Sequence, residues 1–148
     1  ETRNIIKKDN PDALLGIYHC PWDDTEYDGA RRRILGLDYD MLKDLTDVFS
    51  PMVYHGRMGR SAEWVGENIE WFCNRLEVKT GEFPKVWPIV QAYDDPEVIS
   101  EEEFGRVLRY GAGAGSTGVM MFTSNAVAES PAKSEIMKQI YFELGSVK

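Results

Sequence analysis

The sequence predicts a parallel α/β fold built from four consecutive strand–helix units. Four short apolar runs recur along the 148 residues, at positions 14–18, 48–54, 86–93 and 118–122. Their starts are separated by 34, 38 and 32 residues, which is the spacing of βα units in a barrel. Each run is almost continuously apolar, as is typical of strands in a parallel sheet that is covered on both faces.

The first third of the chain shows few clear helix signals. Residues 1–9 have the character of the end of a helix, and Asn10-Pro11-Asp12 forms the turn into the first strand. The segment 21–37 is polar and aromatic, without a clear helical pattern. A short helix that contains Leu42 and Leu45 is expected after Asp38 or Asp40.

The next two helices are better defined. Apolar residues at positions 65, 69, 72 and 76 step by 4, 3 and 4, which places them on one face of a helix. Ser100-Glu101-Glu102-Glu103 is a capping box, in which Ser100 caps the helix and Glu103 reaches back. An apolar stripe at 104, 107 and 108 follows, and Gly111 is expected to end this helix in the left-handed conformation.

A last helix and a glycine-rich turn complete the pattern. Ser130-Pro131 matches the N-cap and first position of a helix, whose residues Ile136, Ile140 and Leu144 are expected to face the core. The stretch Gly111–Gly115 follows a helix and precedes a strand, whereas a phosphate-binding loop follows a strand and opens a helix. We therefore interpret it as a tight turn.

These four units favour half of a (β/α)8 TIM barrel over a complete small sheet. Four parallel strands alone leave two open edges with unpaired backbone groups, and a complete barrel needs about 250 residues. We expect residues 1–148 to be one domain, the C-terminal half of a barrel and a fragment of a longer chain. The alternative, a flavodoxin-like sheet, usually has five strands and a phosphate loop.

Composition excludes several classes of protein. The net charge of −8 is the reverse of what a nucleic-acid-binding protein requires, and Arg31-Arg32-Arg33 is flanked by acidic residues as in a solvated surface segment. Cys20 and Cys73 form neither a disulfide framework nor a zinc site. No apolar stretch is long enough to span a membrane. We expect no cofactor, no metal and no membrane partner.

Candidate site residues follow from the topology, because ligands bind at the carboxyl ends of parallel strands. This edge mixes aromatic rings, carboxylates and amides, which suit the C–H faces and hydroxyl groups of sugars. Paired carboxylates across such a mouth perform glycoside hydrolysis. We expect substrate-binding roles for His19, Trp22, Tyr54, His55, Gln91, Tyr93 and Asn125, and catalytic candidates in Asp23, Asp24 and Asp94. Each also has a structural alternative, as a core histidine, a barrel cap or a turn.

The segment Asp47–Tyr54, with its Ser50-Pro51-Met52-Val53-Tyr54 strand, resembles the sixth strand of glycoside-hydrolase-like TIM barrels. Residues 87–93 resemble their seventh strand, residues 118–122 their closing strand, and residues 15–22 their fifth. The resemblance covers residues 10–145 and implies cleft-lining roles for Tyr54, Gln91 and Tyr93. It also implies that the general acid stands at the end of the fourth barrel strand, which this chain does not contain.

Three functions therefore remain open. The first is a glycoside hydrolase, with this half lining the substrate cleft and the full-length protein secreted or periplasmic. The second is a non-catalytic carbohydrate-binding or structural barrel, and the third is an α/β domain that binds another small molecule. If the 148 residues exist alone, their open edges predict a homodimer.

Overall fold

The computed structural model describes residues 2–79 and 81–146 and has an α/β architecture with a parallel sheet. Its helices and strands, in chain order, are α1 (Thr2–Asp9), β1 (Gly16–His19), α2 (Glu26–Arg33), α3 (Tyr39–Leu42), β2 (Val48–Val53), α4 (Glu63–Leu76), β3 (Lys85–Val86), β4 (Ile89–Gln91), α5 (Glu101–Gly111), β5 (Met120–Phe122), α6 (Ser124–Ala128) and α7 (Pro131–Ser146).

The sheet has the order β1-β2-β4-β5, and β3 also pairs with β2. Every pairing is parallel, so the four predicted strands and their direction are confirmed. β3 and β4 form one strand position that is interrupted at Trp87-Pro88, because proline has no backbone N–H to donate to the ladder.

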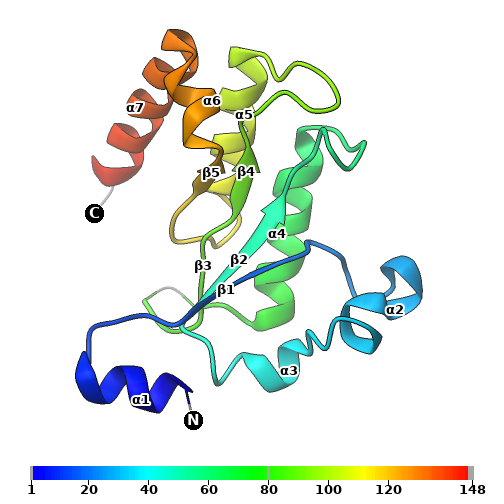
Figure 1. Cartoon of the computed structure of the whole chain (residues 1–148), viewed down its shortest axis with the longest axis vertical. Helices are drawn as coiled ribbons and strands as arrows, with labels where there is room; N and C mark the ends of the chain where they lie inside the picture. Colours follow the sequence, from blue (N-terminus) through cyan, green and yellow to red (C-terminus); the bar gives the residue numbers. More distant parts are fainter. Residues whose placement is uncertain (1, 80, 147–148) are drawn as a thin grey trace.

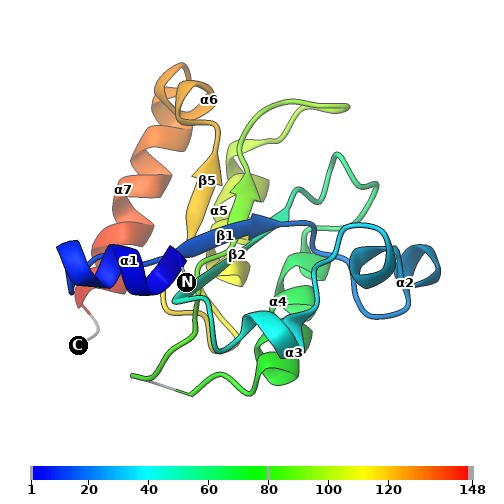
Figure 2. The same ribbon diagram turned by 60° about the horizontal axis from the view of Figure 1, so that its bottom comes forward.

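The two faces of the sheet differ. Phe49, Val53 and Val90 point toward the helices and belong to the main hydrophobic core. Figure 1 shows α4 and α5 behind the strands, and Figure 2 shows the same arrangement from a second side. The alternate residues, such as Gly16, Val48 and Trp87, line a shallow hollow on the opposite face.

The predicted helices are present, with some differences in detail. The buried residues of α4 include those at 65, 69, 72 and 76, as the spacing predicted. Ser100 caps α5 by accepting a hydrogen bond from the backbone N–H of Glu103. The side chain of Glu103 does not reach back, because it contacts His55 at 3.0 Å. Two helices were not expected, α2 and α6.

Two expectations about helix ends are wrong. Gly111 is not a left-handed end residue, since Ala112 caps α5 with a φ of −82°. A Cβ atom at Gly111 would lie 2.9 Å from side-chain atoms of Val90 and Val119, so glycine is needed for the close approach of α5 to the sheet. Leu144 does not face the core and is 41% exposed, whereas Ile140 is 2% exposed.

A buried carboxylate holds the amino-terminal edge together. Asp47 is fully buried, and its Oδ1 accepts hydrogen bonds from the guanidinium of Arg3 at 2.6 and 2.9 Å. Its Oδ2 accepts from the backbone N–H of Leu15. Burial raises the pKa of Asp47, but these hydrogen bonds and the charges of Arg3 and Lys7 outweigh burial and lower the pKa. Asp47 therefore has a structural role, at the end of the sheet opposite the candidate site.

Candidate functional site

Three aromatic rings meet at the carboxyl ends of β2, β4 and β5. Tyr54 and Phe122 are stacked, with ring centroids 5.7 Å apart and an interplanar angle of 23°. Tyr93 stands edge-on to Tyr54 at 6.0 Å and to Phe122 at 5.8 Å. Phe122 is 49% exposed, and partial burial raises the pKa of Tyr54. The three rings form a partly exposed apolar surface, which we call the aromatic patch.

Gln91 holds the loops around the aromatic patch. Its side chain is fully buried, and its Oε1 accepts a hydrogen bond of 3.0 Å from the backbone N–H of Arg57. Its Nε2 donates to the carbonyl oxygens of Tyr93 at 3.0 Å and Asp95 at 2.7 Å. The amide therefore connects the loop after β2 to the loop after β4. Its buried amide thus positions the two loops that border the aromatic patch.

A charged pair borders the aromatic patch. The guanidinium of Arg57 lies 2.6 Å from a carboxylate oxygen of Asp95, and both side chains are substantially exposed. A hydrogen bond with Tyr93, followed by the charges nearby, raises the pKa of Arg57. Arg57 thus provides an exposed donor group next to the rings.

Tyr93 also lines a pocket of about 510 Å³ that contains several polar side chains. Asp94 lines it, and its Oδ1 accepts hydrogen bonds from the backbone N–H of Ile99 at 2.9 Å and from Lys133 at 3.3 Å. These contacts, the Ile99 N–H first, lower the pKa of Asp94. Asn125 is exposed on the same wall. Tyr93 therefore belongs both to the aromatic patch and to a pocket that holds an ionised carboxylate.

Lys133 is a site residue that the sequence interpretation missed. It is 6% exposed, and its Nζ also donates to the carbonyl oxygen of Ala92 at 2.9 Å. A signal was present, because Lys133 stands three residues before Ile136 and seven before Ile140. This spacing places it on the buried face of the last helix.

The two histidines are buried and do not reach the aromatic patch. His19 is 2% exposed and packs against the rings of Tyr39, Phe49 and Phe72 on the helix-covered face. Burial lowers its pKa to about 4. His55 is 1% exposed, and its Nε2 lies 3.0 Å from Glu103. Both side chains contact protein groups and stabilise the ends of β1 and β2.

The loop after β1 places its residues away from the aromatic patch. Trp22 packs on Tyr27 with ring centroids 4.6 Å apart. Asp23 faces α4 in a second pocket of about 320 Å³ that also contains Trp64 and Trp71. Burial raises the pKa of Asp23, but hydrogen bonds from Thr25 and a neighbouring backbone N–H outweigh burial and lower the pKa.

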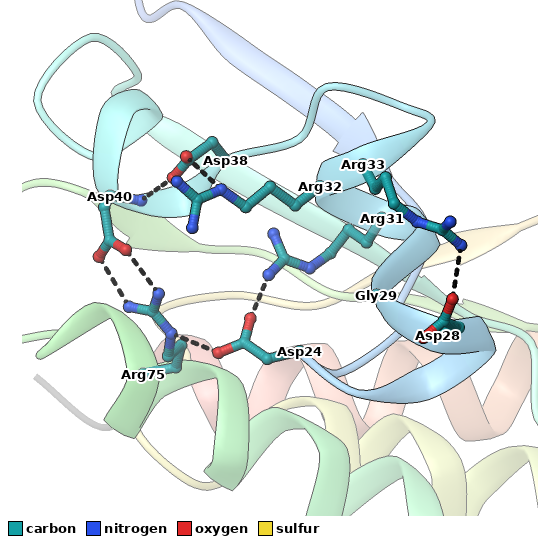
Figure 3. A pocket seen from close by; sticks show the side chains of 9 residues that line it. All are labelled: Asp24, Asp28, Gly29, Arg31, Arg32, Arg33, Asp38, Asp40 and Arg75. Atoms are coloured by element: carbon teal, nitrogen blue, oxygen red, sulfur yellow. Dashed lines mark hydrogen bonds and ion pairs between the residues drawn. The ribbon is translucent and has the colours of Figure 1, made fainter.

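Asp24 belongs to an ion-pair network that Figure 3 shows in detail. It contacts Arg31, which is 3% exposed, and Arg75 at 2.9 Å. Arg75 also donates to both carboxylate oxygens of Asp40, at 2.9 and 2.8 Å, and its hydrogen bonds to Asp40 and then to Asp24 raise its pKa. Arg31 stacks over the ring of Tyr39 at 3.7 Å. Such a network connects α2, α3 and α4.

The pocket enclosed by this network has a volume of about 640 Å³. Four arginines and four aspartates line it together with Gly29. Each arginine has an aspartate partner, and the remaining pairs are Arg32 with Asp38 and Arg33 with Asp28. Because the charges are compensated within the network, we interpret it as structural.

Comparison with known proteins assigns this chain to no family. Neither a protein-family model nor a curated protein matches this chain. Among residues 2–79 and 81–146, the structure shows no group of three or more His, Cys, Asp or Glu side chains placed to hold a metal ion. Within the same ranges, none of the helices is both long and apolar enough to cross a membrane.

The sequence-predicted residues thus separate into two groups. Tyr54, Tyr93, Asp94 and Asn125 come together at the carboxyl ends of the strands, supported by Gln91. His19, Trp22, His55, Asp23 and Asp24 lie elsewhere and contact protein groups. Aromatic rings beside a pocket with hydrogen-bonding groups can bind a sugar, because its C–H faces stack on rings while its hydroxyls need polar partners.

Proposed function

We propose that this chain is half of a (β/α)8 barrel that acts on carbohydrate as a glycoside hydrolase, and that this half lines the substrate cleft. The observation that carries the proposal is the aromatic patch of Tyr54, Tyr93 and Phe122 next to the pocket with Asp94 and Asn125. The resemblance of the strand motifs to glycoside-hydrolase-like barrels supports it.

Asp94 is the candidate catalytic carboxylate in this half. Its lowered pKa keeps it ionised at neutral pH, which fits a nucleophile or a general base, but not a general acid. The general acid would have to be a different residue of the complete barrel.

A non-catalytic carbohydrate-binding barrel is the second candidate, and one observation favours it. The contacts of Asp94 with Ile99 and Lys133 are those of a structural carboxylate. Asp95, its neighbour, is paired with Arg57. A barrel with these contacts would bind sugar through the aromatic patch without cleaving it.

Sugar binding is tested with Tyr93→Ala. Soluble cello- and chito-oligosaccharides should bind the unaltered chain in a calorimetric or NMR titration. Loss of the ring should weaken binding by about tenfold, because stacking on an aromatic face is worth about 1.5 kcal/mol. The control is Phe142→Ala, which removes a ring that is 78% exposed on α7, and binding should not change. Equal affinity of both variants, or no binding by the unaltered chain, would contradict the proposal.

Asp94→Asn then separates the two candidates in the complete barrel. A catalytic Asp94 requires that hydrolysis is lost while oligosaccharide binding remains. Full hydrolysis in the variant would remove Asp94 from the mechanism. If the unaltered barrel and the Asp94→Asn variant both bind oligosaccharides and neither cleaves them, the protein is a non-catalytic binding protein.

A further inference from the structure

The face of the sheet opposite α4 and α5 is apolar and open. Its hollow of about 250 Å³ is lined by Leu14, Gly16, Tyr18, Val48, Ser50, Trp87 and Met120, none of which is charged. Tyr18 is 70% exposed and Leu14 is 39% exposed. Apolar side chains at this density on one sheet face indicate a surface that another protein segment covers.

The sheet also has two unpaired edges within the described residues. β1 ends the strand order on one side and β5 ends it on the other. Each edge presents a row of backbone N–H and C=O groups that can pair with a further parallel strand. A covering partner must therefore complete two edges as well as one face.

The register across the sheet defines the geometry of that partner. His19 of β1 is level with Pro51 of β2, so the following residues, Cys20 and Met52, are also level. Met52 is level with Ile89, and Ile89 is level with Met120. A line drawn across the sheet from the end of β1 thus arrives at the start of β5.

We propose that a second copy of this chain covers the open face and closes an eight-stranded barrel. A twofold axis parallel to the strands preserves strand direction, so β5 of each copy becomes a parallel neighbour of β1 of the other. The line that starts at Cys20 of one copy reaches Met120 of the same copy. If Met120 pairs with Gly16 of the second copy, the line enters the second β1 at position 16 instead of position 20. Each copy therefore contributes a register shift of four residues. Two copies give a shear of eight, the value of (β/α)8 barrels.

This register explains the exposed aromatic rings at both edges. Phe122 is two residues beyond Met120, and Tyr18 is two beyond Gly16, so the rings of Phe122 and Tyr18 become neighbours at each seam. The side chains at all four of these positions are on the open face. A shift by four residues keeps them on the same face, because strand side chains alternate between the two faces with a period of two. Trp87 and Val48 then lie inside the closed barrel.

The closure also requires a movement of α1. A helix that follows one strand covers the seam to the next strand, so α7 of one copy would lie beside β1 of the other copy, close to the end of the sheet where α1 is attached (Figure 1). α1 buries none of its residues and is attached by ion pairs of Arg3 and Lys7 with Asp47. An outward movement of α1 breaks these ion pairs, so the contacts formed at the two seams must outweigh their loss.

Sedimentation of the 148-residue chain tests the proposal, which rests on the half-barrel architecture and not on sugar binding. The chain should sediment as a dimer at micromolar concentration. Tyr18→Lys should raise the dissociation constant by at least about tenfold, because it places a charge at the centre of each seam. The control is Met41→Lys, which changes a residue of α3 that is 70% exposed in the single chain. Circular dichroism verifies that both variants remain folded.

A monomeric chain, or equal dissociation constants for the two variants, would overturn the proposal and leave the Tyr93→Ala result unaffected. The register has its own test in a Cys20→Ser background. Equimolar Tyr18→Cys and Phe122→Cys chains should form a mixed disulfide on mild oxidation. Met41→Cys with Phe122→Cys should not, and equal yields for both mixtures would refute this register.

Discussion

Replacing Gln91 by methionine should destabilise the fold and loosen the candidate site together. Methionine has nearly the same length and volume, but it removes three partly buried hydrogen bonds, one from the N–H of Arg57 and two to the carbonyls of Tyr93 and Asp95. At about 1 kcal/mol for each bond, the free energy of unfolding should fall by about 3 kcal/mol. For a domain of this size, that corresponds to a decrease in Tm of roughly 6–12 °C.

Urea unfolding monitored by circular dichroism measures this loss, and a titration with oligosaccharide measures the effect on the site. The control is Gln139→Met on α7, where an exposed glutamine donates one hydrogen bond of 3.0 Å to Glu143. Surface changes of this kind alter stability by about 0.5 kcal/mol or less. If Gln91→Met costs no more than Gln139→Met, Gln91 does not hold the two loops together.

Two further predictions concern buried titratable groups. The pKa of His19 is about 4 in the fold, against an unperturbed value of about 6.5. Between these two values the unfolded chain binds more protons than the folded chain. The free energy of unfolding should therefore decrease by roughly 3 kcal/mol as pH falls from about 6.5 to about 4. Urea unfolding at several pH values should show this slope in the unaltered chain and not in His19→Phe; an unchanged slope would contradict the assignment. Asp47→Asn should cost about 2 kcal/mol at neutral pH, because charge-assisted hydrogen bonds from Arg3 are weakened. Since the folded pKa of Asp47 is lowered, the difference in stability between the unaltered chain and Asp47→Asn should disappear as pH falls through that pKa. The control is Asp44→Asn, at an exposed position, which should have little effect on stability at any pH.

Strand positions were predictable because each strand lies within a nearly continuous apolar run. The run at 48–54 contains β2, and the run at 86–93 contains β4 and half of β3. The cap at Ser100 was predictable for a local reason, since its hydrogen bond reaches only three residues along the chain. The break at Trp87-Pro88 did not follow from the apolar pattern, although proline was a visible signal.

The orientation of side chains at the strand ends was less predictable. A continuously apolar run has no alternation to show which residues face the helices, so His19 was expected at the mouth. In the fold its ring packs against Phe72 of α4. His55 was likewise expected to contact substrate, but its Nε2 contacts Glu103 of α5.

The sequence by itself determined the parallel α/β class, the strand positions, and the chemical character of the carboxyl edge, because periodicity and local capping are properties of neighbouring residues. Only the tertiary structure decided which polar residues meet. Gln91 bonds to backbone groups of two loops, and Asp94 pairs with Lys133, 39 residues away. Contacts between distant segments depend on how helices and loops pack on the sheet, and that packing cannot be read from local patterns along the chain.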